Sequence, residues 1–158
     1  MQIKNPSIAL FVEDIAVSKQ FYHDILSLEI EFDFGKNIIF KGGIAIWEIN
    51  PKHIIPMHLG EKCYYPSNRF ELYFETENLQ DVHATLRDAK VAFLHEVHEE
   101  SWGQLTIRFF DPDNHLIEIG ESMPTFVNRM LLDSGMTKEK VSNKTGISLQ
   151  DIENIVRK

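Results

Sequence analysis

Hydrophobic and polar residues alternate most regularly over residues 28–34, where LEIEFDF has the period that is typical of a half-buried strand. Upstream, SIALFV at residues 7–12 is a short run of strand-forming residues, and Asp14 stands as a helix N-cap before a pattern of helical period. Gly35 begins a turn, after which the apolar pattern returns. The first half is therefore predicted to run strand, helix, strand, strand, strand, over residues 7–12, 15–26, 28–34, 38–40 and 44–49.

The second half of the pattern repeats this order. RFELYFET is again a strand pattern, and Asn78 is a helix N-cap before residues with an apolar stripe at helical spacing. WGQLTIRFFDPDNHLIEIGE predicts a β-hairpin, because Asp and Asn side chains bond nearby backbone amides in turns and proline fixes φ. The predicted elements are strands at residues 69–76 and 91–96, a helix at 79–89, and the hairpin at 102–121.

The two halves align as an internal duplication. VEDI at residues 12–15 falls on TENL at 76–79, and IWEI at 46–49 falls on LIEI at 116–119. Each unit has one sheet face to bury and needs its partner or its helix to cover it. The segment between the halves holds three prolines and is expected to be a linker without regular structure. The predicted organisation is a first βαβββ module at residues 1–50, a linker at 51–68 and a second module at 69–121.

Residues 122–158 form a tail of different character. Gly135 and Gly146 separate three stretches of helical apolar spacing, which predicts three short helices. The stretch MTKEKVSNKTGISLQDIENIV is similar to a helix-turn-helix. Its second helix exposes acidic and amide groups, however, and an acidic recognition face opposes phosphate contact. A packing or partner-binding role is therefore favoured over DNA binding.

The overall composition is that of a globular protein, with 43% hydrophobic and 25% charged residues. A net charge of −8 disfavours nucleic acid as the partner of the main body and favours a small molecule. The amino terminus has no signal-like pattern, no segment approaches membrane-spanning length, and Cys63 is the only cysteine. We therefore expect a cytoplasmic protein without an internal disulfide or a membrane partner.

Several polar or amphipathic groups lie on the apolar strands of the closing hairpin, as in the wall of a pocket. Arg108 is a charge within such a strand, which could pair with a ligand carboxylate, pair with a glutamate, or face outward. His95 and His98 are three residues apart in a strand pattern, so we expect them on opposite faces. The candidate ligand-binding residues are Trp47, Tyr73, Trp102, Gln104 and Arg108, although Trp47 and Tyr73 could also be ordinary core residues.

The chain resembles the vicinal oxygen chelate superfamily in three features. These are the doubled βαβββ order, the segment ALFVEDIAVSKQFYHDIL and the segment DPDNHLIEI. That superfamily includes glyoxalase I, bleomycin resistance proteins, fosfomycin resistance enzymes and extradiol dioxygenases. The resemblance covers roughly residues 3–121 and is specific for the superfamily rather than for one reaction. It implies an α+β fold in which two paired modules form a curled mixed sheet, a small organic ligand in the cup of that sheet, and a homodimer.

The resemblance also implies a metal site at the first and last strands of each module. The matching positions are Ser7, Glu48, Glu71 and Glu118, where many metal-binding relatives have His or Gln at the first-strand positions. A His-rich site would suit Zn or Ni, whereas three carboxylates suit Mn or Mg. Without an ion, carboxylates gathered in a cup would repel one another, and some would have to protonate.

Two classes of function follow from this resemblance and remain open. The first is a metal-dependent lyase or isomerase, in which a metal chelates the substrate and Glu118 and Glu48 act as ligands or as the base. The second is a protein without a metal that binds or sequesters a small molecule or drug through Trp47, Tyr73, Trp102 and Arg108. A DNA-binding regulator that acts through the tail is the third and least favoured class.

Overall fold

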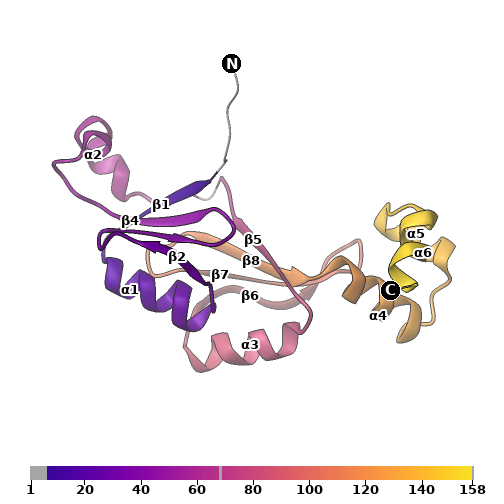
Figure 1. Ribbon diagram of the computed structural model, residues 1–158. Coiled ribbons are helices and arrows are strands. Elements are labelled where there is room, and N and C mark those ends of the chain that lie inside the picture. The colour runs from indigo at the N-terminus through magenta and orange to yellow at the C-terminus, as the bar shows by residue number, and fades with distance from the viewer. Residues whose placement is uncertain (1–6, 68, 158) are drawn as a thin grey trace, which may run out of the picture. The chain divides into compact units, whose positions relative to one another are not determined.

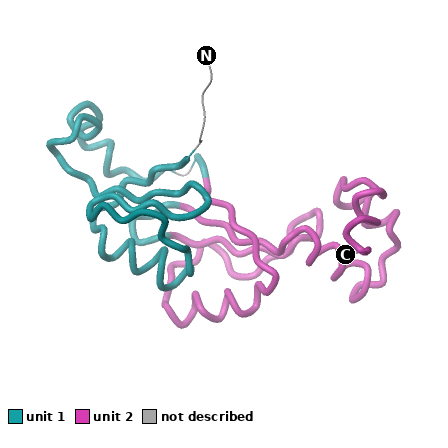
Figure 2. The backbone as a smooth tube through the Cα atoms, viewed as in Figure 1, with its two compact units in different colours: residues 1–70, 111–115 teal, residues 71–110, 116–158 magenta. Residues whose placement is uncertain are grey.

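The computed structural model describes residues 7–67 and 69–157, which are shown as a ribbon in Figure 1. The chain divides into two compact units, coloured separately in Figure 2. Unit 1 comprises residues 1–70 with 111–115, and unit 2 comprises residues 71–110 with 116–158. Each unit is described by itself below.

Unit 1 has the predicted βαβββ order. Its four-stranded sheet has the strand order β1-β4-β3-β2, in which β1 and β4 are parallel and the other neighbours are antiparallel. The Asp14 carboxylate accepts hydrogen bonds from the amides of Ala16 and Val17, which confirms it as the helix cap. The elements are β1 (Ile8–Val12), α1 (Ile15–Lys19), the π-helical continuation η1 (Gln20–Ile25), β2 (Ile30–Asp33), β3 (Asn37–Phe40) and β4 (Ile44–Glu48).

The core of unit 1 lies between this sheet and its helix. Phe21 and Tyr22 on η1 are buried, and the Tyr22 ring lies 5.9 Å from that of Phe40 on β3. Tyr22 donates a 2.7 Å hydrogen bond to the carboxylate of Asp111, in the turn segment that belongs to this unit. Burial, followed by the charge of Asp111, raises the pKa of the Tyr22 hydroxyl. The hydroxyl is therefore a permanent donor to Asp111.

The expectation of an irregular linker is wrong for residues 54–64, which form α2 (Ile54–Leu59) and the 3₁₀ helix η2 (Gly60–Tyr64). Pro56, which suggested an irregular chain, falls in the first turn of α2, where its missing N–H removes no helical hydrogen bond. His53 caps this helix by accepting from the amide of Ile55 at 3.4 Å. The proline therefore permits a helix start at this position.

Unit 2 repeats the arrangement with the strand order β5-β8-β7-β6. As in unit 1, the first and last strands of the module are parallel neighbours, which confirms the duplicated α+β fold. Asn78 caps the helix, as the sequence predicted. The elements are β5 (Leu72–Thr76), α3 (Leu79–Asp88), β6 (Ala92–Glu99), β7 (Leu105–Phe110) and β8 (Leu116–Glu121).

The two faces of the second sheet differ in character. One face is apolar and buried, and the nearby helix α3 contributes Leu79 and Leu86 to this core. Because side chains alternate along a strand, the residues between these apolar positions point to the opposite face. That opposite face carries Tyr73, Arg108 and Glu118. The buried apolar residues of the sheet are Leu72, Ile107, Phe109, Ile117 and Ile119.

The tail consists of three helices, as predicted, namely α4 (Met123–Leu132), α5 (Lys138–Thr145) and α6 (Leu149–Val156). Gly146 ends α5 with a left-handed backbone (φ 77°), which a glycine adopts without steric cost. The helices share a small core of their own, made of Phe126, Val127, Met130, Val141 and Ile152. In the part of the chain that the structure describes, every helix is too short or too polar to cross a membrane.

Candidate functional site

Strand register brings four chemically active side chains into one row across the second sheet. Tyr73 on β5 is opposite Glu118 on β8, Glu118 is opposite Arg108 on β7, and Arg108 is opposite His95 on β6. Residues directly opposite each other on neighbouring strands project to the same side of a sheet. We call this side of the β5-β8-β7-β6 sheet the polar face.

Arg108 is the centre of the polar face and binds three carboxylates. Its Nε donates to Glu71 at 2.9 Å, and its Nη1 donates to Glu100 at 2.7 Å. Its Nη2 donates to Glu118, whose side chain is only 6% exposed. Of the three alternatives for Arg108, the structure has the pairing with glutamates. With all groups ionised, the three carboxylates exceed the single guanidinium in charge, so the cluster is anionic.

A proton shared between Glu118 and Glu71 reduces this excess of negative charge. Burial, and then the adjacent carboxyl of Glu71, raise the pKa of Glu118 to about 7 against the lowering effect of Arg108. Burial also raises the pKa of Glu71, but hydrogen bonds from Arg108 and Glu118 outweigh it and leave that pKa below its usual range. Near neutral pH, Glu118 therefore holds a transferable proton beside an ionised Glu71.

His95 and His98 lie on the same face, so the prediction that they would point to opposite faces is wrong. Irregularities in β6 shift its register, so that His95 is opposite Arg108 and His98 is opposite Thr106. The two rings lie 5.6 Å apart. His95 Nε2 lies 3.2 Å from Arg108 Nη1, which has hydrogens only to donate, so this nitrogen is the acceptor. Its Nδ1 then donates to the Glu96 carbonyl at 2.7 Å.

Gln104 connects two aromatic side chains at the edge of the polar face. Its Nε2 donates to the Tyr73 hydroxyl and to the Glu121 carbonyl, both at 2.8 Å, and its Oε1 accepts from the Trp102 indole at 3.1 Å. Gln104 is buried, whereas Tyr73 and Trp102 are 47% and 38% exposed. The amide thus fixes two aromatic rings that remain open to solvent.

The remaining predicted site residues belong to unit 1. Glu48 binds Lys36 and accepts from the Ile15 amide at 3.2 Å, and these two hydrogen bonds hold the pKa of its carboxyl below its usual range. Trp47 stacks on Phe11 with ring centroids 6.2 Å apart. Ser7 is exposed directly before β1. Unit 2 brings together six of the candidate residues that the sequence suggested, whose site role stays a prediction, whereas the sequence gave no signal for Glu100 or for the shared face of the histidines. The six are Glu71, Tyr73, Trp102, Gln104, Arg108 and Glu118.

These carboxylates do not fit the metal site that the resemblance implied. Within residues 7–67 and 69–157, no group of three or more His, Cys, Asp or Glu side chains is arranged to hold a metal ion. The cation that Glu71, Glu100 and Glu118 surround is the guanidinium of Arg108, and Glu48 is paired with Lys36. Each of these carboxylates therefore already binds a cationic side chain of the protein itself, and the guanidinium of Arg108 takes the central position that a metal ion would need.

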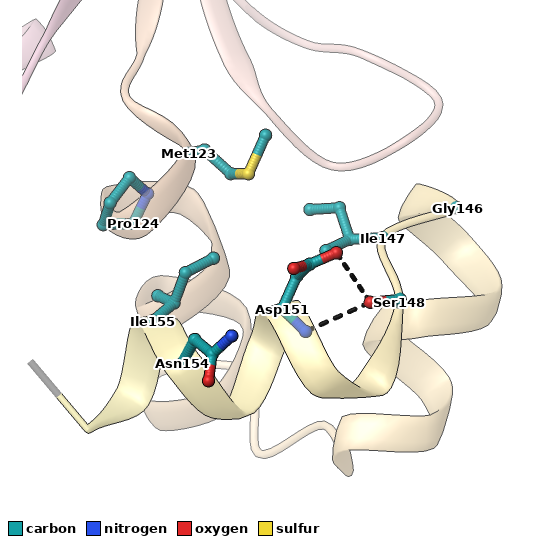
Figure 3. A pocket seen from close by; sticks show the side chains of 8 residues that line it. All are labelled: Met123, Pro124, Gly146, Ile147, Ser148, Asp151, Asn154 and Ile155. Atoms are coloured by element: carbon teal, nitrogen blue, oxygen red, sulfur yellow. Dashed lines mark hydrogen bonds between the residues drawn. The ribbon is translucent and has the colours of Figure 1, made fainter.

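A separate pocket of about 590 Å³ lies in the tail, lined by the start of α4 and by residues 146–155 (Figure 3). Its acidic residue Asp151 accepts from the Ser148 hydroxyl at 2.6 Å, and its amide donates to the same hydroxyl at 3.1 Å. These polar groups serve as the cap of α6. The polar face is therefore the stronger candidate for a functional site.

Comparisons with known proteins agree with this fold. The profile of the glyoxalase-like domain matches residues 6–124. A crystal structure of a protein of unknown function from Agrobacterium tumefaciens strain C58 is 32% identical, with a TM-score of 0.67, over 78% of this chain and 97% of that one. No curated protein matches the sequence.

Two more distant structures share the fold at low sequence identity. A lactoylglutathione lyase from Agrobacterium tumefaciens is 19% identical, with a TM-score of 0.54, over 73% of this chain and 91% of that chain. A glyoxalase/bleomycin resistance protein/dioxygenase family enzyme from Burkholderia phytofirmans PsJN is 14% identical, with a TM-score of 0.62, over 74% of this chain and 97% of that chain. The chain therefore belongs to the glyoxalase-like domain family of the vicinal oxygen chelate superfamily.

Proposed function

We propose that the protein binds a small organic molecule on the polar face of the second sheet. The observation that carries this proposal is the burial of Glu118 beside Arg108, on a sheet face that keeps Tyr73 and Trp102 open to solvent. Charged groups are costly to bury, and buried groups with a perturbed pKa are concentrated at functional sites. The neighbouring aromatic rings supply the apolar surface that small-molecule sites need.

The charge of the cluster favours a neutral or cationic ligand. Each nitrogen of the Arg108 guanidinium already donates to a carboxylate, so an anionic ligand that approaches Arg108 would also meet the excess negative charge of these three carboxylates. Glu71, Glu100 and the nearby Glu75 add negative charge to the same region. A ligand amine would be attracted by these carboxylates and could also stack on Tyr73 or Trp102.

Proton transfer on the bound molecule is a second candidate function, favoured by Glu118 alone. A carboxyl group with a pKa of about 7 is poised both to give and to take a proton at neutral pH. Glu118 would then act as the general acid or base of a lyase or isomerase, while Glu71 and Arg108 hold its carboxyl in place. No step of this proposal passes through a metal, because the carboxylates present do not fit one.

Binding to matched probes tests the proposed ligand class. We expect benzylamine to bind more tightly than benzyl alcohol, and benzoate to bind least, because the three differ mainly in charge. At pH 8, where most of Glu118 is ionised, Glu118→Gln should weaken benzylamine binding, whereas Glu31→Gln, on the exposed part of β2, should not. Tightest binding of benzoate, or equal benzylamine affinity in both variants, would refute the proposal. Mn, Ni or Zn salts are expected to leave the melting temperature unchanged.

DNA binding through the tail finds less support than the small-molecule site. Arg129, Lys138, Lys144 and Arg157 each pair with a carboxylate, which lowers the positive charge that the tail offers to phosphate groups. We retain a homodimer as a proposal that sedimentation can test.

A further inference from the structure

Arg129 on α4 forms a forked ion pair with the end of β8. Its Nε and Nη2 donate to the two carboxylate oxygens of Glu121, each at 2.7 Å. The same Nη2 donates to the carbonyl of Gly103 at 2.6 Å. Glu121 is only 4% exposed, and its carboxylate also accepts from the Leu105 amide at 2.9 Å. Such bidentate, charge-assisted bonds fix geometry in a way that a single surface ion pair does not.

The segment that Arg129 holds is the turn between β6 and β7, residues 100–104, which we call the site loop. Gly103 has a left-handed backbone there (φ 99°), and a Cβ at this position would lie 2.6 Å from the sulfur of Met130 on α4. Lys144 on α5 pairs with Glu99, directly before the loop, at 2.8 Å. Two helices of the tail therefore contact the site loop or the strand that leads into it.

The site loop supplies three groups to the polar face. Glu100 accepts from Arg108 at 2.7 Å, Trp102 offers an exposed ring, and Gln104 fixes the Tyr73 hydroxyl. The glyoxalase-like profile ends at residue 124, so most of α4 and all of α5 and α6 lie beyond the family fold. The tail is therefore an addition to that fold which reaches residues of the candidate site.

We infer that the C-terminal helices are the positioning element of the small-molecule site, and that Arg129 is the residue through which they fix the site loop. The inference rests on the proposed function for its consequence on ligand binding, but the fixing of the loop is a separate claim. Without the hydrogen bonds of Arg129 to Gly103 and Glu121, the site loop is no longer bound to α4. Glu100 and Gln104 are then no longer held beside Arg108 and Tyr73. The tail then governs the affinity of a site that it does not itself line.

The test uses the full chain with Arg129→Met, which removes the fork, and Arg129→Lys, which keeps the charge. Arg157→Met is the matched control, since Arg157 pairs with Glu153 on its own helix α6 and its side chain is 73% exposed. The chain has two tryptophans, so the indole N–H resonance of Trp102 can be assigned by its persistence in Trp47→Phe. That resonance and the amide exchange of Gly103 and Leu105 report on the loop without any ligand.

We expect Arg129→Met to shift the Trp102 indole resonance and to speed amide exchange at Gly103 and Leu105 by about tenfold or more, because charge-assisted bonds are lost. Benzylamine affinity should fall as well, Arg129→Lys should be intermediate, and Arg157→Met should match the wild type. A lower melting temperature with unchanged Trp102 and exchange signals would overturn the inference, since the tail would then only add stability.

Lys144→Met provides a milder variant should Arg129→Met fail to fold. It removes the ion pair to Glu99 and should speed exchange at the same amides to a smaller extent, whereas unchanged exchange would count against the inference. Failure of the proposed function has a different signature. In that case Glu118→Gln leaves benzylamine binding unchanged, while the Trp102 and exchange signals still respond to Arg129→Met.

Discussion

We expect the free energy of unfolding of the wild-type protein to decrease as pH rises toward neutrality. In Glu118→Gln this decrease should be absent. The carboxyl of Glu118 has a pKa of about 7 in the folded protein, against an ordinary value of 4.5. The folded state therefore binds this proton more tightly than the unfolded chain does. Stability is greatest below the unfolded pKa, falls as pH rises from about 4.5 to about 7, and is then constant.

The size of the effect follows from the same two values. Each unit of pKa difference corresponds to about 1.4 kcal/mol, so full ionisation of Glu118 costs about 3 kcal/mol as an upper bound. Glu71 acts in the opposite direction, because its pKa is lowered, and its stabilising contribution appears as pH rises through its own titration range. The net loss between pH 5 and pH 8 should therefore be about 1–3 kcal/mol.

Urea unfolding at pH 5, 6, 7 and 8 measures this loss. Trp102 fluorescence in a Trp47→Phe background follows unit 2 specifically, because Trp102 is then the only tryptophan. Glutamine keeps the shape of a protonated glutamate, so Glu118→Gln should match the wild type at pH 5 and exceed its stability at pH 8. Glu31→Gln should retain the wild-type profile. Parallel pH profiles for wild type and Glu118→Gln would refute the assignment of the neutral-pH proton to Glu118.

Three further substitutions test other parts of the structure. Tyr22→Phe should destabilise unit 1 by about 1–3 kcal/mol in urea unfolding, because Asp111 loses a buried donor. Gly120→Ala should lower both the melting temperature and benzylamine affinity, since the added Cβ would lie 2.7 Å from Gln104 Nε2. Arg108→Met should raise the pKa of Glu118 above its wild-type value in a carbon-13 NMR titration of labelled glutamate, because the guanidinium that lowers it is gone.

The duplicated fold could be predicted from the sequence because local signals agreed with the global arrangement. Asp14 and Asn78 act as helix caps, and residues 102–121 form the predicted hairpin. The strand at 91–96 was predicted too short, because β6 continues to Glu99 through two register shifts. No residue type in this segment predicts such a shift. The same register shifts explain why His95 and His98 lie on one face, although regular alternation along a strand predicts opposite faces.

The contacts among the candidate site residues were less predictable than the strands on which they lie. Glu118 and Arg108 were both recognised as polar groups on apolar strands, but their pairing depends on register between strands. Glu100 lies in a turn and reaches Arg108 through tertiary structure alone. Transfer of metal-ligand positions from the superfamily could not reveal that an arginine of this chain binds the same carboxylates. Only the three-dimensional arrangement distinguishes a carboxylate that can bind a metal ion from one that already forms an ion pair with a side chain.

The most direct test of the central claim is NMR mapping of benzylamine binding on the full-length protein. At pH 8, where most of Glu118 is ionised, we expect the largest shifts at the Trp102 indole, the Gln104 side-chain amide and the Arg108 Nε–H, and Glu118→Gln should remove them. Shifts confined to the tail pocket around Ile147 and Ile155, or shifts that survive Glu118→Gln unchanged, would contradict the assignment of the polar face as the small-molecule site.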